Sequence, residues 1–261
     1  MVIFFDIDGT LMDEKSQILP RSAADAIGQL VEKGHIPVVN TGRPWTHIHP
    51  AVRGLPFAGW ICAGGQQVRL GDRWLKNEMI PMEWMPVIIQ GVRKHGLQVV
   101  YEAQGGFYLD GANSDNHPEI AIQSELIRGI GCYVRDIAQG LEHPVVKFCT
   151  FDAPGCDRAA FIGEVSRWFD PIDRRGMAEF LIKGNSKAAG LQLILETLSC
   201  PISDTMAFGD SANDLPMLRA VGTAVCMGGG VEAAKQAAHF VTRSVLDDGI
   251  AYALRHYGLI R

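Results

Sequence analysis

The chain has 261 residues, of which 47% are hydrophobic and 20% are charged, a composition typical of a globular protein with one large domain or two modest ones. The formal net charge of -5 gives no overall attraction to nucleic acid or to an anionic membrane, so we expect neither as a partner. The sequence has no apolar run near the roughly 18 residues that a membrane span needs, and its start lacks a signal-peptide pattern. The six cysteines are scattered singly along the chain, which favours reduced thiols over disulfides. We therefore expect a cytoplasmic protein.

The first third of the chain alternates between two hydrophobic patterns. Apolar runs at residues 2–5, 36–40 and 59–63 predict strands, and helical spacing predicts helices at 22–32 and 45–52. Strands that alternate with helices predict a parallel sheet covered by helices.

The pattern changes after residue 81 and returns near residue 186. A helix at 83–94 and short strands at 98–101 and 107–109 predict an α+β insertion, with further signals up to residue 182. The last third predicts helices at 187–197, 214–220 and 245–257 and strands at 205–208 and 223–226. We therefore expect a core domain at 1–81 and 183–261, whose sheet the last third completes, and an inserted domain at 82–182.

Two carboxylates stand directly after the first predicted strand. The run Asp6-Ile7-Asp8-Gly9-Thr10 offers two acids two residues apart, followed by a Gly-Thr pair whose backbone N–H groups can face an anion. This spacing suits a nucleophile and a general acid. An isolated Asp-x-Asp is more often a pair of solvated loop acids, so the interpretation depends on the clusters that follow.

A second polar cluster, Asn40-Thr41-Gly42-Arg43-Pro44, follows the second predicted strand. A hydroxyl beside a glycine turn can bind a phosphate oxygen. The alternative is a plain helix start, with Thr41 as the N-cap and Pro44 in the first turn.

Two more clusters lie in the last third. Lys183 and Lys187 mark the return from the insert, where a lysine could neutralise phosphate or could simply flank a helix cap at the surface. Asp210 and Asp214 follow the strand at 205–208 and could bind Mg²⁺ directly and through its water shell, or cap a helix. Parallel sheets bind ligands at the carboxyl ends of their strands, and four clusters there outweigh the separate alternatives.

These four clusters, in this order, resemble the motifs of the haloacid dehalogenase superfamily. The Thr-Gly-Arg run at 41–43, the Lys-Gly-x-Ser-Lys run at 183–187 and an α+β insert between them are similar to the Cof-like phosphatase subgroup with a C2-type (IIB) cap. The resemblance implies an α/β fold: a Rossmann-like core with a parallel sheet, plus an inserted α+β C2-type cap domain. One departure is Gly64, which stands where many Cof-like relatives have an asparagine, and a glycine cannot make a contact through that side chain.

The resemblance also implies roles for single residues. Asp6 would attack phosphorus, and Asp8 would protonate the leaving oxygen and then activate the water that cleaves the aspartyl-phosphate. Mg²⁺ is the implied cofactor, with Asp214 acting through the water shell and Asn213 helping to fix Lys187 or the phosphate. The implied site residues are Asp6 and Asp8 for catalysis; Thr41, Gly42, Lys187 and Asn213 for phosphate and substrate; and Asp6, the Asp8 main-chain carbonyl, Asp210 and Asp214 for the metal.

We expect a Mg²⁺-dependent phosphatase acting on a small phosphorylated metabolite, with sugar phosphates as first choice, in a monomer or weak homo-oligomer. The alternatives are a phosphomutase on the same scaffold and a non-catalytic metabolite-binding protein. Both Asp6 and Asp8 argue against the latter, because a binding module needs neither a nucleophile nor an acid. Candidate substrate-reading residues in the insert are Glu102, Tyr108, Asn113, Asn116 and His117. His47 and His49 do not form a metal pair on a helix, because positions two apart point in different directions.

Overall fold

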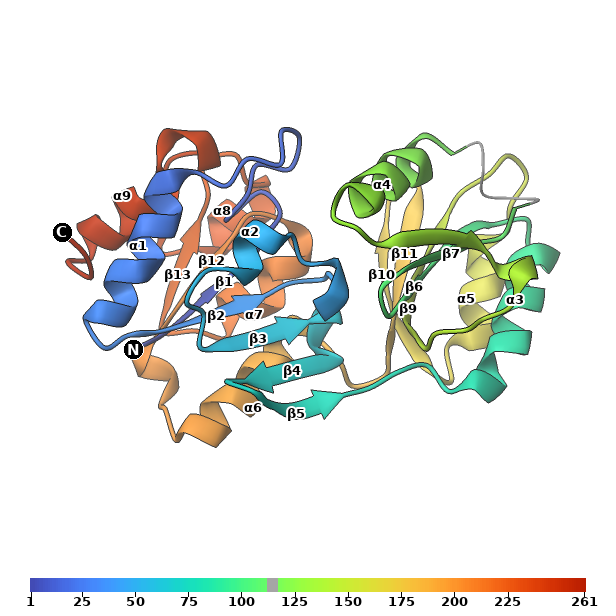
Figure 1. The fold of residues 1–261 in the computed structure, drawn as a ribbon, viewed down its shortest axis with the longest axis horizontal. Coiled ribbons are helices and arrows are strands. Elements are labelled where there is room, and N and C mark those ends of the chain that lie inside the picture. Colours follow the sequence, from blue (N-terminus) through green and yellow to red (C-terminus); the bar gives the residue numbers. More distant parts are fainter. Residues whose placement is uncertain (112–116) are drawn as a thin grey trace. The chain divides into compact units, whose positions relative to one another are not determined.

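The structure is a computed structural model that describes residues 1–111 and 117–261. The chain forms two compact units (Figure 1). The core unit comprises Met1–Arg43, His49–Asn77 and Ser186–Arg261, and the insert unit comprises Pro44–Ile48 and Glu78–Asn185. The expected insert at 82–182 lies within Glu78–Asn185, but nothing in the sequence pattern indicates that Pro44–Ile48 belongs to the same unit.

An eight-stranded sheet forms the centre of the core unit, in the order β14-β13-β12-β1-β2-β3-β4-β5. The strands from β14 to β3 are parallel, as the sequence predicts. An antiparallel hairpin, β4 and β5, extends this sheet at one edge and is absent from the predicted elements, although Gly71-Asp72 between its strands is a typical hairpin turn. The strands are β1 (Val2–Phe5), β2 (Ile36–Asn40), β3 (Gly59–Cys62), β4 (Gln67–Leu70), β5 (Arg73–Asn77), β12 (Thr205–Gly209), β13 (Thr223–Cys226) and β14 (Phe240–Val241).

Successive residues of a strand point to opposite faces of the sheet. The apolar strands therefore present apolar side chains on both faces, and helices cover them. Val2 and Phe4 pack with apolar residues of α6, α7 and α8, such as Leu191 and Met217. The helices α1 and α9 pack against each other, as Figure 1 shows in blue and red. The helices of the core unit are α1 (Arg21–Glu32), α2 (Pro50–Arg53), α6 (Lys187–Leu198), α7 (Leu215–Arg219), α8 (Glu232–Ala237) and α9 (Gly249–His256).

The helix expected at 45–52 is wrong as a continuous element. The structure has a 3₁₀ turn at Trp45–His47, extended backbone at Ile48 and His49, and then α2. Pro50 explains the break, because the residue before a proline is disfavoured in helical conformation. Further 3₁₀ turns lie at Ala63–Gly65, Met82–Trp84, Ile137–Gln139, Ile202–Asp204, Ala212–Asp214 and Val245–Asp247.

The insert unit has its own six-stranded sheet, in the order β10-β11-β9-β6-β7-β8. Its pairs are antiparallel except for β7 and β8. The helix expected at 83–94 packs in the core of this unit, with Met85, Ile88 and Val92 buried. Its elements are α3 (Met85–Lys94), β6 (Gln98–Ala103), β7 (Gly106–Leu109), α4 (Pro118–Gly129), β8 (Tyr133–Asp136), β9 (Val145–Phe151), α5 (Arg158–Val165), β10 (Phe169–Arg174) and β11 (Met177–Ile182).

No helix in the described part of the chain is both long enough and apolar enough to cross a bilayer.

Candidate active site

Three of the predicted clusters follow strands that are neighbours in the core sheet. β1 pairs in parallel with β2 on one side and β12 on the other, with Phe5 opposite Val39 and Phe208. The backbone N–H of Asp6 continues this ladder by donating to Phe208 O at 3.1 Å. Asp6, Thr41 and Asp210 therefore begin loops at the same edge of the sheet, where open α/β sheets bind ligands.

The first and last of these loops touch each other at Gly9. This residue has a φ of +74°, and a Cβ atom on it would lie 2.4 Å from Oδ2 of Asp210. The hydroxyl of Thr10 lies 3.5 Å from Oδ1 of Asp210. The close approach needs a glycine, because any other residue would clash with the carboxylate and strain the backbone.

Asp6, Asp210 and Asp214 form a compact cluster of carboxylates. One oxygen from each lies within 4.8 Å of the others, and Asp6 and Asp214 are buried. Burial, and then the charge of Asp214, raise the pKa of Asp6 well above its usual value and the pKa of Asp210 to about 7. Buried oxygen donors that repel one another fit a hard divalent cation, which would relieve that repulsion.

Lys187 lies inside this cluster. Its Nζ is 2.6 Å from Oδ1 of Asp6 and 2.6 Å from Oδ1 of Asp214. Burial acts to lower the pKa of Lys187, but the two carboxylates outweigh it and raise the pKa, so the amine is charged. Lys183, by contrast, is exposed. Of the two lysines at the return from the insert, the structure brings Lys187 to the carboxylates.

The backbone of α6 sets the position of this amine. The Ser186 hydroxyl caps the helix by accepting from Ala189 N at 3.0 Å. The buried Asn40 side chain at the end of β2 donates from Nδ2 to the main-chain O of Lys187 at 3.0 Å. Asn40 thereby ties the second cluster to the third, a role that nothing in the sequence pattern indicates.

Asp214 is oriented through both of its oxygens. Oδ1 binds the Lys187 amine, and Oδ2 accepts from the backbone N–H groups of Asp210 and Ser211 at 3.0 Å each. This arrangement suits a residue that supports a metal site rather than one that binds the ion directly. The carboxamide oxygen of Asn213 accepts from the Ser211 hydroxyl, and its expected role toward Lys187 or phosphate stays a prediction.

Arg43 holds the side chain of Asp8. Its Nε donates to Oδ2 at 2.8 Å and its terminal nitrogen donates to Oδ1 at 2.5 Å, which is the two-bond geometry that fixes a carboxylate most firmly. The backbone N–H of Arg43 donates to the Thr41 hydroxyl at 3.2 Å. This arginine belongs to the Thr-Gly-Arg run, but nothing in the sequence pattern indicates that it binds Asp8.

The loop after β3 supports this cluster through backbone atoms. Ala63 N donates to Arg43 O at 2.8 Å, and Gly64 N donates to Thr41 O at 3.1 Å. Gly64 therefore contributes a main-chain N–H, which needs no side chain. At Gly65 a Cβ atom would lie 2.3 Å from Ser186 O, so this glycine lets the start of α6 approach the loop.

Comparisons with known proteins agree with this arrangement. The sequence model of the haloacid dehalogenase-like hydrolase family matches residues 3–254. The chain belongs to this family. The 5-amino-6-(5-phospho-D-ribitylamino)uracil phosphatase YcsE of Bacillus subtilis is 38% identical, over 99% of this chain and 96% of YcsE. The pyridoxal phosphate phosphatase YbhA of Escherichia coli is 27% identical, over 96% of each chain.

A solved structure extends the likeness to the fold. BT1666 of Bacteroides thetaiotaomicron, described as a phosphatase of the haloalkanoate (HAD) enzyme superfamily, aligns with a TM-score of 0.81 at 26% identity, covering 99% of this chain and 95% of that one. The Rossmann-like core with an inserted α+β domain is thus confirmed. The chain is an enzyme of the phosphatase class in the haloacid dehalogenase-like family.

The candidate substrate-reading residues of the insert differ in their surroundings. Tyr108 is fully buried, and its oxygen accepts from the backbone N–H groups of Glu142 and His143. His117 accepts from Glu119 N at the start of α4. Glu102 is buried beside Lys147. Asn113 and Asn116 lie outside the described residues.

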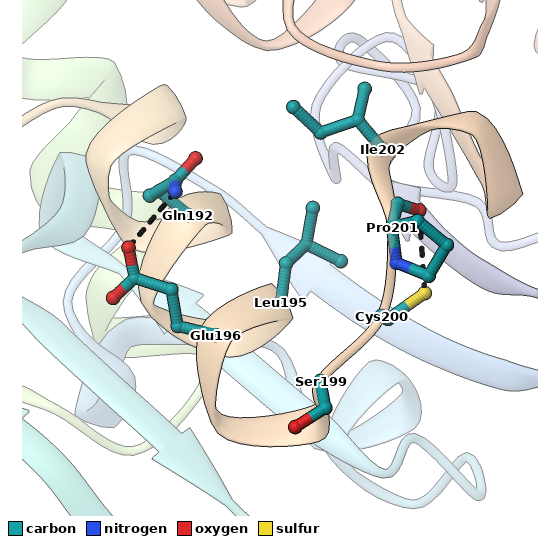
Figure 2. Close-up of a pocket in the computed structure, with 7 residues that line it drawn as sticks. All are labelled: Gln192, Leu195, Glu196, Ser199, Cys200, Pro201 and Ile202. Atoms are coloured by element: carbon teal, nitrogen blue, oxygen red, sulfur yellow. Dashed lines mark hydrogen bonds between the residues drawn. The ribbon is translucent and has the colours of Figure 1, made fainter.

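A surface cavity of about 340 Å³ lies in the core unit, away from the carboxylate cluster. Figure 2 shows Leu195 at the end of α6 and Ile202 on the segment that follows. Lys187 begins the same helix and Leu198 ends it, so at about 1.5 Å per residue the cavity lies at the end remote from the carboxylates. It contains none of the predicted site residues.

Proposed function

We propose that the chain is a Mg²⁺-dependent phosphatase that hydrolyses a small phosphate monoester through an aspartyl-phosphate on Asp6. The observation that carries the proposal is the Lys187 amine, 2.6 Å from both Asp6 and Asp214. The charge of Lys187 opposes the rise in the pKa of Asp6 that burial and Asp214 cause, and it lies beside the place where phosphate oxygens gain charge.

The reaction has two steps. In the first, a carboxylate oxygen of Asp6 attacks phosphorus, the bond to the leaving oxygen breaks, and Asp8 gives that oxygen a proton. In the second, a water attacks phosphorus, Asp8 takes the proton of that water, and the bond between Asp6 and phosphorus breaks. Inorganic phosphate leaves, and both carboxyl groups return to their starting state.

Asp6, Asp210 and the main-chain carbonyl of Asp8 would hold Mg²⁺, with Asp214 supporting from the second coordination sphere. A bound cation supplies positive charge next to the transferring phosphoryl group. The Thr41 hydroxyl and the Gly42 backbone would bind phosphate oxygens at the end of β2, and Asn213 would assist them.

A sugar phosphate is the first choice of substrate class. YcsE and YbhA are named for a ribityl phosphate and for pyridoxal phosphate, which are both small monoesters with polar leaving groups. The insert would select among such groups and exclude bulk water.

Phosphate release from the purified protein tests the proposal. The panel should contain sugar phosphates, pyridoxal phosphate, flavin mononucleotide and nucleotides, with and without Mg²⁺. We expect steady, Mg²⁺-dependent release from at least one sugar phosphate or related monoester. Dependence on a bisphosphate activator without steady release would indicate a phosphomutase instead.

A further inference from the structure

We propose that Pro44–Ile48, here called the strap, couples the insert unit to the acid–base residue Asp8, with Arg43 as a positioning residue that depends on the anchored strap. The inference rests on the proposed function, because it assigns Asp8 the acid–base role. It adds a device that the reaction scheme does not contain: a short covalent link between an anchor in the insert and the residue that orients Asp8.

Arg43 is the residue directly before the strap, and it belongs to the core unit. The guanidinium of Arg43 binds both oxygens of Asp8, and its side chain is largely buried, at 19% exposure. A planar guanidinium with two parallel hydrogen bonds fixes the direction of a carboxylate as well as its distance. A displaced Arg43 would therefore release or re-aim Asp8.

The other end of the strap is anchored in the insert through His47. This side chain is 1% exposed. Its Nε2 lies 2.9 Å from Ala103 O and donates to it, and its Nδ1 lies 3.6 Å from Glu102. The ring also packs edge-on against Phe107, with 5.2 Å between centroids.

Thr46 adds two further ties to the insert. Its hydroxyl accepts from Gly105 N at 2.9 Å, and its carbonyl accepts from the Cys132 thiol at 3.4 Å. Two adjacent residues of the strap are thus bound to the sheet of the insert and its turns. This explains why a segment so early in the sequence belongs to the insert unit.

Glu102 makes the anchor rigid. Its carboxylate lies 3.0 Å from Nζ of Lys147, which lies 2.6 Å from Glu179. Burial acts to raise the pKa of Glu102, but Lys147 and His47 outweigh it and lower the pKa to about 2. Buried charges bound in this way are costly to separate, so we expect His47 to move together with the sheet of the insert.

The link between the two ends is short. Three residues, Pro44, Trp45 and Thr46, separate Arg43 from His47, and Pro44 is buried with its φ restricted by its ring. Residues 45–47 form a 3₁₀ turn, so the strap has little slack. Ala63 N holds the main-chain O of Arg43, and the short strap ties the same residue to the anchor at His47, so loss of that anchor should disturb the guanidinium and with it the direction of the Asp8 carboxylate.

A double-mutant cycle on turnover tests the coupling. We expect His47→Ala to lower kcat about tenfold with little change in KM, because Asp8 is misplaced and substrate binding is not. We expect Arg43→Ala to lower kcat at least as much. In the Arg43→Ala background His47→Ala should have no further effect, because its route to Asp8 is already cut. His47→Gln, whose amide can still donate to Ala103 O, should restore most of kcat.

Two matched controls separate coupling from general damage. His95 lies 3.1 Å from Glu164 and contacts Phe161, much as His47 contacts Glu102 and Phe107. Arg93 binds Asp110 through the same two-bond geometry, at 2.6 and 3.0 Å. His95→Ala and Arg93→Ala should each leave kcat within about twofold of the parent.

The proposed coupling through the strap would be contradicted if His47→Ala and Arg43→Ala had independent, multiplicative effects on kcat. It would also be contradicted if His47→Ala left kcat unchanged. Should His47→Ala fail to fold, Thr46→Val removes only the acceptor of Gly105 N–H and takes its place in the cycle. Undiminished turnover in Asp6→Asn would instead overturn the proposed function. If Asp6→Asn inactivates the enzyme but His47→Ala and Arg43→Ala act multiplicatively, the coupling through the strap is contradicted and the proposed function is not.

Discussion

The amine of Lys187 lies 2.6 Å from Oδ1 of Asp6, although 181 positions separate the two residues in the sequence. A third group, Asp214, shares the amine at the same distance. One positive charge thus serves two buried carboxylates at the sheet edge, and its removal has a predictable cost.

Lys187→Met should abolish most turnover and weaken folding. The substitution leaves Asp6 and Asp214 buried without their cation, which costs about 3–5 kcal/mol of unfolding free energy, and it removes a charge that binds phosphate, which costs about 100-fold in kcat. Urea unfolding and phosphate release measure the two effects. Lys183→Met is the control, because Lys183 is exposed, and it should change neither by much. Equal effects of the two substitutions would contradict the role of Lys187 as the cation of the carboxylate cluster.

Asp8→Asn should lose most turnover even with a good leaving group, because the second step still needs a base to activate water. With p-nitrophenyl phosphate we expect one rapid release of nitrophenol per enzyme, followed by slow turnover. Stopped-flow absorbance measures this burst. Steady turnover at the parent rate would remove Asp8 from the second step.

Gly9→Ala should destabilise the fold more than Gly34→Ala. Both glycines have similar positive φ, +74° and +78°, but only Gly9 has a neighbour that the new Cβ would meet. Gly34→Ala reports the backbone strain alone, about 1–2 kcal/mol, and the excess for Gly9→Ala reports the contact with Asp210. Urea unfolding of both variants gives the difference. Equal losses would mean that the two loops do not approach as described.

Stabilisation by Mg²⁺ should grow as pH rises. The pKa of Asp210 is raised from its ordinary 3.8 to about 7 by burial and then by Asp214. Between these values the folded metal-free protein holds a proton that the unfolded chain has lost, so its stability falls as pH rises toward 7. Mg²⁺ needs the ionised carboxylate, and its apparent affinity should fall about tenfold per pH unit below 7 for one displaced proton.

Thermal unfolding with and without Mg²⁺ measures this dependence. The rise in Tm should be clearly larger at about pH 8 than at about pH 5, and Asp210→Asn should remove most of it at both values. A rise that is independent of pH would show that the cation binds elsewhere.

Much of the fold could be predicted because its signals are local. The strands β1, β2 and β12 are apolar runs, and each is followed at once by polar residues, which places Asp6, Thr41 and Asp210 at one sheet edge through the rules for parallel sheets. The helix expected at 45–52 is wrong because Pro50 disfavours a helical conformation at His49, so the apolar spacing on either side belongs to two separate short elements.

The pairings between distant side chains could not be predicted in the same way. Nothing in the spacing of Asp8 and Arg43 indicates that they bind each other, because the contact depends on how two loops turn at the sheet edge. The position of Pro44–Ile48 in the insert unit was equally hidden, because it depends on the burial of His47 against residues that lie far along the chain. The antiparallel hairpin of β4 and β5 is a different case, because its turn, Gly71-Asp72, is a two-residue pair typical of tight hairpins and is a local signal in the sequence.

In the proposed reaction Asp6 carries the phosphoryl group during turnover. Rapid acid quenching of the enzyme with a monoester substrate and Mg²⁺, followed by mass analysis of its peptides, measures this directly. We expect one added phosphoryl group on the peptide that contains Asp6, formed at least as fast as turnover and absent in Asp6→Asn, which should be inactive yet folded. A phosphoryl group on another residue, or full turnover in Asp6→Asn, would contradict it.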